Sequence, residues 1–139
     1  MSLGRIRIVI STDGDIVVAR QSGRELAAQI GCSSTDATLI ATAISEVARN
    51  ILTHAGHGEV EMQTIDASAN RRREPAVEVI ARDNGPGIAD IERAMQDGYT
   101  TGRGLGLGLP GARRLMDEFE ITSEVGVGTT IVMRKWRTR

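Results

Sequence analysis

The stretch Gly102-Arg103-Gly104-Leu105-Gly106-Leu107-Gly108-Leu109-Pro110-Gly111 is the most glycine-rich part of the chain. Glycine alternates with leucine here, just ahead of a predicted helix that has Pro110 near its first position. Such a run can present consecutive backbone N–H groups and a helix N-terminus to phosphate oxygens. Glycine also allows tight turns and a close approach of the backbone to a ligand. The stretch therefore predicts a phosphate-binding loop.

Two common phosphate-binding folds are excluded by the sequence around this loop. A Gly-x-Gly-x-x-Gly spacing is present, but the preceding residues Asp97 to Thr101 are loop-like, whereas a dinucleotide-binding unit needs a strand there. A Walker-type loop is excluded because no Gly-Lys-Ser or Gly-Lys-Thr sequence occurs. The glycine-rich loop therefore matches neither of these two phosphate-binding loops.

A second glycine-containing segment, Asp83-Asn84-Gly85-Pro86-Gly87-Ile88, follows a predicted strand. Its carboxylate stands at the strand end, where a planar ligand could approach over bare backbone. A carboxylate accepts hydrogen bonds and an adenine amino group donates them, so Asp83 is a candidate adenine ligand. Asn-Gly and Pro-Gly are also common turn dipeptides, and the segment taken alone could be only a surface turn.

Two further segments complete the set. Glu46 and Asn50 are four residues apart on a predicted helix, so they share one face, which we expect at the edge of the core. A carboxylate that accepts a proton, one turn from an amide oxygen that holds Mg²⁺, suits phosphoryl transfer, although such a pair is more often only solvated. Gly126 to Thr130 is a glycine turn that leads into the last predicted strand and is, by itself, an ordinary hairpin.

The rest of the chain predicts one domain, residues 1–139, with a single core. Strands at both ends, a strand pair in the middle and helices between them indicate an α/β (α+β) sandwich. We expect a mixed, mostly antiparallel sheet covered on one face by helices. The predicted strands are Arg5–Ile10, Glu59–Ile65, Pro75–Arg82, Glu120–Val125 and Thr129–Trp136. The predicted helices are Asp13–Ile30, one from Ser33 to His54, a short one within Ile88–Asp97, and Pro110–Glu118.

Composition excludes several classes of partner. The formal net charge is −1 and aromatic residues make up only 2% of the chain, which argues against binding to nucleic acid. No apolar stretch is long enough to span a membrane, and the N-terminus lacks the apolar core of a signal peptide. Cys32 is the only cysteine, so no intramolecular disulfide can form. We therefore expect a cytoplasmic protein that binds neither nucleic acid nor membranes.

The four segments together, in this order and spacing, resemble the GHKL superfamily of Bergerat-fold ATPases. The N, G1, G2 and G3 boxes of that superfamily resemble Glu46–Asn50, Asp83–Gly87, Gly102–Gly111 and Gly126–Thr130. The resemblance covers nearly the whole chain. It implies a Bergerat-type sheet, with ATP and Mg²⁺ as the ligands.

Within the superfamily, the chain resembles the small serine/threonine kinases of bacterial partner-switching pathways, and among them the RsbT type. The segments that carry this resemblance are Asp97–Thr101, Gly104–Gly111, Arg113–Phe119 and Lys135-Trp136. A histidine kinase is not expected, because His54 and His57 stand at a helix end and do not resemble a phospho-accepting histidine.

The resemblance implies a kinase that phosphorylates Ser or Thr of STAS-domain proteins (RsbS- and RsbR-like) in a complex that holds it inactive until stress. Once released, it would bind and activate a PPM-type phosphatase (RsbU-like). The main alternative is an anti-sigma factor of the RsbW or SpoIIAB type, which sequesters a sigma factor. A module that binds ATP and transfers nothing is a third possibility, and the intact Glu46 weighs against it.

The resemblance also implies roles for single residues. Glu46 would be the base that takes the proton from the attacking hydroxyl, and Asn50 would ligate the Mg²⁺ that bridges the ATP phosphates. Asp83 would bind the adenine amino group, with Thr129 or Thr130 assisting directly or through water. The other residues expected to contact the nucleotide are Gly85, Gly87, Arg103, Gly104, Leu105, Gly106, Leu107 and Gly108.

Two arginines and one segment near this site are less specific. Arg49 is expected to pair with Glu46 three residues earlier, in preference to a phosphate. Arg103 is better placed for a phosphate, or is alternatively only solvated. The segment Asp90 to Arg103 would form a short lid over the nucleotide.

Overall fold

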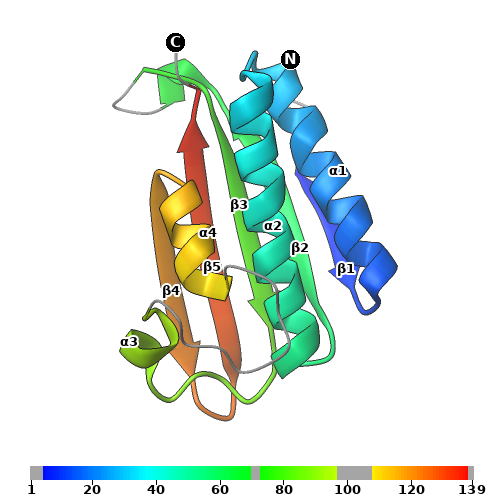
Figure 1. Cartoon of the computed structure of the whole chain (residues 1–139), viewed down its shortest axis with the longest axis vertical. Coiled ribbons are helices and arrows are strands. Elements are labelled where there is room, and N and C mark those ends of the chain that lie inside the picture. The colour runs from blue at the N-terminus through cyan, green and yellow to red at the C-terminus, as the bar shows by residue number, and fades with distance from the viewer. Residues whose placement is uncertain (1–4, 70–72, 97–107, 138–139) are drawn as a thin grey trace.

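The computed structural model describes residues 5–69, 73–96 and 108–137, which form one antiparallel sheet with helices on one face (Figure 1). The strand order is β1-β2-β3-β5-β4, and every pairing is antiparallel. The strands are β1 (Ile6–Ile10), β2 (Gly58–Ile65), β3 (Ala76–Asp83), β4 (Glu118–Glu124) and β5 (Gly128–Trp136). The helices are α1 (Asp13–Gln29), α2 (Ser34–His54), α3 (Ile91–Ala94) and α4 (Gly108–Leu115), with a 3-10 turn η1 (Ala67–Ala69) after β2. The predicted α+β class is confirmed, and the mostly antiparallel sheet proves to be wholly antiparallel among the described strands.

The two long helices begin at side chains that satisfy free backbone N–H groups. At the start of α1 the Thr12 hydroxyl accepts from the Asp15 N–H, while Asp15 Oδ2 accepts from the Thr12 N–H at 2.9 Å. This reciprocal pair is a capping box, which fixes the first turn of a helix. At the start of α2, Ser33 Oγ accepts from the Asp36 N–H at 3.1 Å. Both starts agree with the sequence prediction.

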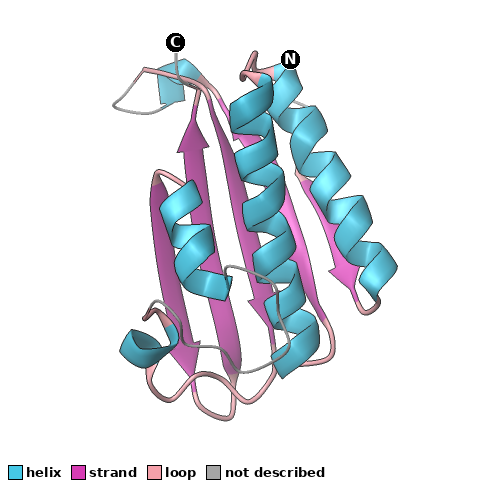
Figure 2. Cartoon of the chain, viewed as in Figure 1, coloured by secondary structure: helices cyan, strands magenta, loops and turns pink. Residues whose placement is uncertain are grey.

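The core lies between the sheet and the helices, and Figure 2 shows the helices lying over one face of the sheet. The inner face of α2 is fully buried against the sheet because apolar residues recur at helical spacing. The strands contribute every second side chain to this core. Burial of apolar side chains supplies most of the stabilisation of a small domain. The largest of these buried side chains are Ile10, Ile40, Ile44, Val47, Ile51, Val60, Met62, Val77, Val79, Ile131 and Met133. Over the part of the chain that the structure covers, no helix combines the length and apolar character needed to cross a bilayer.

Two predicted boundaries near the glycine-rich loop are wrong. Helix α4 spans Gly108–Leu115, where the sequence predicted Pro110–Glu118, and β4 already begins at Glu118. The chain joins the sheet early because the Asp117 N–H donates to the Arg134 carbonyl at 2.9 Å and Glu118 pairs with the Arg134 guanidinium at 2.8 Å.

Helix α3 lies within the segment Ile88–Asp97, so the predicted short helix is confirmed. It begins only after Asp90, whose Oδ1 accepts from the Arg93 N–H at 3.0 Å and caps the helix. The Ile88 N–H is instead bound by the Ser123 hydroxyl of β4 at 2.7 Å. This contact between distant parts of the chain keeps residue 88 out of the helix.

Candidate active site

Three of the four glycine- and acid-containing segments meet at one end of the sheet. Asp83 is the last residue of β3 and Thr129 is the second residue of β5, and the two are register partners across the sheet. The C-terminal half of α2 and the first residues of α4 lie over the same end, the lower end in Figure 1. Asp83 and Thr129 follow Glu46 by 37 and 83 residues in the sequence, and the fold brings all three to this end of the sheet.

Glu46 is the acidic side chain that α2 contributes to this end of the sheet. Only 8% of its surface is exposed, and its Oε1 accepts from the Gly108 backbone N–H at 2.9 Å. The carboxylate therefore lies at the N-terminus of α4, where unpaired N–H groups favour negative charge. The sequence predicted Glu46 at the edge of the core, but the packing of α4 against α2 buries it.

Arg49 lies beside this carboxylate, with its Nη1 3.4 Å from Glu46 Oε2. The predicted ion pair three residues apart is confirmed. Because nearly half of the Arg49 side chain is exposed, the pair orients Glu46 more than it stabilises the fold. Asn50, one helical turn beyond Glu46, is half-buried at the same end of α2.

The Asp83 carboxylate is fixed by its own loop. Its Oδ1 accepts from the Gly85 N–H at 2.9 Å, two residues later, in the manner of an Asx turn. A Cβ at Gly85 would stand 2.6 Å from the Ala55 Cβ, so only glycine lets the loop pass the end of α2. The carboxylate is half-buried over the end of the sheet.

Gly87 and Gly128 hold this loop against the β4–β5 turn. Gly87 has φ +77°, and a Cβ there would lie 2.4 Å from the Glu124 carbonyl oxygen. Gly128 has φ +145°, and its Cβ would lie 2.0 Å from the Asp83 carbonyl oxygen. Both backbone angles favour glycine, and both approaches leave no room for a side chain. Gly87 thus lies where two loops touch, and its expected contact with the nucleotide stays a prediction.

Ser123 joins these segments and was not predicted from the sequence. Its Oγ accepts from the Ile88 N–H at 2.7 Å, donates to the Gly128 carbonyl at 3.1 Å and lies 2.8 Å from Thr129 Oγ1. No signal marked it, because a serine in a strand that alternates in exposure is an ordinary surface residue.

The two threonines that were expected to help Asp83 bind adenine point to opposite faces of the sheet. Thr129 is 5% exposed and lies on the helix-covered face, in register with Asp83. Thr130 is paired with Arg82 and Thr122, and strand alternation turns its side chain to the open face. The structure therefore brings Thr129, and not Thr130, to the side of the sheet that carries Asp83.

The family follows from a comparison of this chain with known proteins. Residues 10–135 match the model of the histidine kinase-like ATPase domain. This chain belongs to that family. It is 48% identical over 127 residues to the serine/threonine-protein kinase RsbT of Bacillus subtilis, a match that covers 91% of this chain and 92% of the relative. The predicted superfamily and the predicted class of enzyme, a serine/threonine-protein kinase, are confirmed by these matches.

Two proteins with lower sequence identity to this chain are also similar to it. The anti-sigma F factor of Halalkalibacterium halodurans is 34% identical over 116 residues, covering 81% of this chain and 77% of the relative. Among solved structures, the RsbU and RsbW domains of a Mycobacterium tuberculosis protein share the fold, with a TM-score of 0.66 and 22% identity. That match covers 98% of this chain and 33% of the longer one, and at this identity it shows the fold alone.

Part of the predicted site lies outside the described residues. Arg103, Gly104, Leu105, Gly106 and Leu107 belong to this part, as do residues 97–102 of the predicted lid. Gly108, the last of the expected phosphate-binding residues, is described and opens α4. The roles of all these residues, including Gly108, stay predictions.

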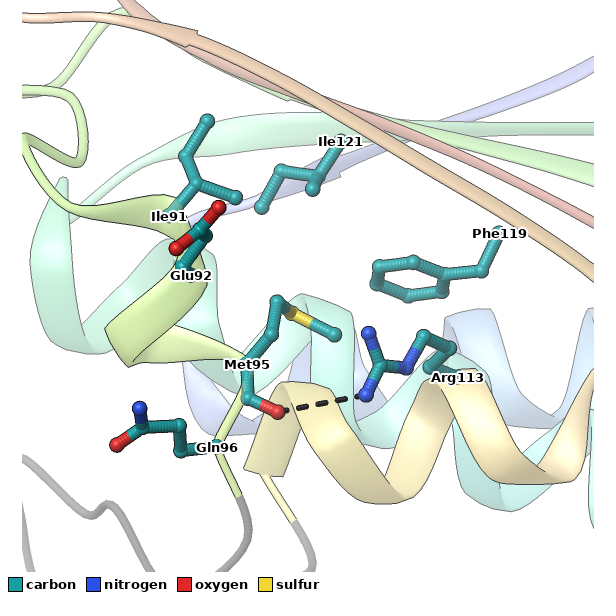
Figure 3. Close-up of a pocket in the computed structure, with 7 residues that line it drawn as sticks. All are labelled: Ile91, Glu92, Met95, Gln96, Arg113, Phe119 and Ile121. Atoms are coloured by element: carbon teal, nitrogen blue, oxygen red, sulfur yellow. Dashed lines mark hydrogen bonds between the residues drawn. The ribbon is translucent and has the colours of Figure 1, made fainter.

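A hollow of about 490 Å³ lies between α3, α4 and β4 (Figure 3). The Arg113 guanidinium reaches across it to the Met95 carbonyl at 3.5 Å. Its walls are partly apolar, and none of its lining residues comes from α2 or from the Asp83 loop. Ile91, Glu92, Met95 and Gln96 belong to the described part of the predicted lid, and the other lining residues are Arg113, Phe119 and Ile121. The hollow therefore does not include Glu46, Asn50 or Asp83.

Proposed function

We propose that this chain is a cytoplasmic switch kinase that uses Mg-ATP to phosphorylate a Ser or Thr of STAS-domain proteins of the RsbS and RsbR kind. In this proposal it acts in a bacterial stress-response pathway, and after release from those proteins it binds and activates a PPM-type phosphatase of the RsbU kind. The 48% identity to RsbT over most of both chains supports this reading. The structural observation behind it is the contact of 2.9 Å between the buried Glu46 carboxylate and the Gly108 N–H.

That contact supports a role for Glu46 as the base. In the proposed site the phosphates bind at the glycine-rich loop and the start of α4, because helix N-termini attract anions. A carboxylate already held at that helix start stands close to where an attacking hydroxyl must arrive. Glu46 would accept the hydroxyl proton as the oxygen bonds to the transferred phosphorus, and ADP would leave.

The residues at this end of α2 also suit a magnesium ion. Mg²⁺ prefers oxygen ligands, and the amide oxygen of half-buried Asn50 lies one turn from Glu46 at the same end of the helix. Asn50 would hold the ion, and the bound ion would offset negative charge on the phosphates. Arg49 keeps Glu46 in place through its ion pair at 3.4 Å.

The base of the nucleotide would be bound at the sheet end. Asp83 accepts hydrogen bonds, and its carboxylate is oriented by the Gly85 N–H. An adenine amino group is a donor, so the two are complementary. The loop that carries Asp83 is bound to the β4–β5 turn, since the Gly126 N–H donates to the Pro86 carbonyl at 2.9 Å.

A second candidate function comes from the anti-sigma F factor relative at 34% identity. In that case the chain would act chiefly by sequestering a sigma subunit, and phosphoryl transfer would serve release. The two functions predict different stable complexes.

The experiment that separates them presents both partners to the same protein. The purified chain and Mg-ATP are incubated with a STAS-domain protein and, separately, with a sigma subunit from the same cell. Phosphate on a Ser or Thr of the STAS protein, located by mass spectrometry, and no sigma complex in gel filtration is the expected result. A stable sigma complex without transfer to any STAS protein would contradict the proposal and favour the anti-sigma function.

A further inference from the structure

The hydroxyl of Ser123 stands at the junction of three backbone segments of the candidate site. Its Oγ lies 2.7 Å from the Ile88 nitrogen after the Asp83 loop, and 3.1 Å from the Gly128 carbonyl oxygen at the start of β5. Its third neighbour is Thr129 Oγ1 at 2.8 Å. Ser123 and Thr129 are also register partners on adjacent strands.

The chemistry of these neighbours fixes the direction of every hydrogen bond. A hydroxyl has one proton to donate and two lone pairs with which to accept. The Ile88 amide can only donate, so Ser123 accepts there, and the Gly128 carbonyl can only accept, so Ser123 donates its proton there. The remaining lone pair of Ser123 can then only accept from Thr129. The Thr129 proton is therefore directed at Ser123, and the lone pairs of Thr129 Oγ1 are left to accept.

We propose that Ser123 is a positioning residue that sets Thr129 as a hydrogen-bond acceptor and so makes the site select a purine with an amino group at position 6. This inference rests on the proposed nucleotide site at Asp83. Asp83 and Thr129 are register partners on the same face of the sheet, and both then present acceptors. A 6-amino group offers two protons to such acceptors, whereas a 6-carbonyl offers only lone pairs.

Burial strengthens the effect of this arrangement. Thr129 is 5% exposed, so bulk water competes little for its hydroxyl. A buried hydrogen-bond acceptor that faces another acceptor is left without a donor, which is costly. A site built from acceptors therefore rejects analogues that lack the donor group. ATP should accordingly bind more tightly than inosine triphosphate, which differs in carrying a carbonyl at position 6 and a proton on the adjacent ring nitrogen.

The test compares the affinities of ATP and inosine triphosphate for the wild-type chain and the Ser123→Ala variant by isothermal titration. Without Ser123 the Thr129 proton is free to turn toward the base. ATP should then bind about 2- to 12-fold more weakly, the loss of one net hydrogen bond. Inosine triphosphate should bind as well as before or better, so the preference for ATP should fall by at least the same factor. Ser123→Thr keeps the hydroxyl and should restore the preference.

A matched control is available on the same strand. Thr122 precedes Ser123 and points to the open face of the sheet, so Thr122→Ala should leave both affinities unchanged. In a Thr129→Val background, which removes the oriented hydroxyl, Ser123→Ala should no longer change the preference. Should Ser123→Ala fold poorly by the fluorescence of buried Trp136, Ser123→Cys preserves side-chain size and serves for the same comparison.

The outcomes separate this inference from the proposed function. If Ser123→Ala weakens both nucleotides by the same factor, Ser123 only supports the loops and the inference is overturned. If Asp83→Asn abolishes ATP binding while Ser123→Ala leaves the preference intact, the nucleotide site stands and the inference alone fails. If Asp83→Asn leaves ATP binding unchanged, the proposed site and the inference fall together.

Discussion

Replacing Gly87 by alanine tests whether the Asp83 loop is fastened to the β4–β5 turn as the structure shows. Gly87 has φ +77°, and the added Cβ would lie 2.4 Å from the Glu124 carbonyl oxygen, a backbone atom that cannot rotate away. Gly126, in the β4–β5 turn, is the matched control, since it has φ +83° and an added Cβ there would have nothing within 4 Å. The two variants share the backbone cost and differ only in the clash.

The expected magnitudes follow from these two terms. A left-handed backbone costs a non-glycine residue about 1–2 kcal/mol, which is the whole expected effect of Gly126→Ala. Overpacking against a fixed neighbour adds about 1–3 kcal/mol, so Gly87→Ala should lower the free energy of unfolding by about 2–5 kcal/mol. The shifted loop also displaces Asp83, and ATP should bind more weakly to Gly87→Ala than to Gly126→Ala.

The assay is urea unfolding followed by the fluorescence of Trp136, the single tryptophan, which is 4% exposed in the folded chain. Titration with ATP under native conditions gives the second readout. Equal losses of stability for the two variants would show that Gly87 does not approach Glu124. Unchanged ATP affinity in a folded Gly87→Ala variant would separate the Asp83 loop from nucleotide binding.

Two further predictions concern titratable groups outside the site. Backbone N–H groups of Ser11 and Thr12 lower the pKa of Asp15 below its ordinary value of 3.8. Its ionised form therefore stabilises the fold above that pH, and the stabilisation is lost as the pH falls through the lowered pKa. Asp15→Ala should be less stable than wild type near neutrality, with the gap narrowing in acid; a gap independent of pH in urea unfolding would refute this. Burial, with the Asp36 carboxylate adding to it, raises the pKa of the Cys32 thiol above its ordinary 9.0. Alkylation by iodoacetamide at mildly alkaline pH should thus be slower in the folded chain than in urea, and equal rates would contradict the burial.

The order of strands and helices could be predicted because burial repeats with a clear period. Ile6, Ile8 and Ile10 alternate along β1, and Ile40, Ile44, Val47 and Ile51 recur at helical spacing along α2. Glycines and capping residues mark most of the ends. The boundary between α4 and β4 was missed because no glycine or proline separates Leu115 from Glu118. Pairing with β5, a contact distant in sequence, decides it instead.

The candidate site was predicted in its outline but not in its contacts. Glu46, Asn50, Asp83 and Gly87 could be found because each stands in a short segment with a recognisable composition. The burial of Glu46 could not, because it depends on the Gly108 N–H, 62 residues later. Ser123 carries no local pattern, and its role arises only where it meets Ile88, 35 residues earlier.

The central claim is that Glu46 is the base that takes the proton from the attacking hydroxyl. Single-turnover phosphoryl transfer by the Glu46→Gln variant tests this claim most directly. Glutamine keeps an oxygen that can accept from the Gly108 N–H, so the site should stay assembled while the side chain can no longer take a proton. Glu25→Gln, on an exposed position of α1, is the control. We expect ATP to bind to all three proteins with similar affinity and transfer by Glu46→Gln to be slower by about 100- to 10,000-fold. Transfer at the wild-type rate by a folded, ATP-bound Glu46→Gln variant would contradict the assignment of Glu46 as the base.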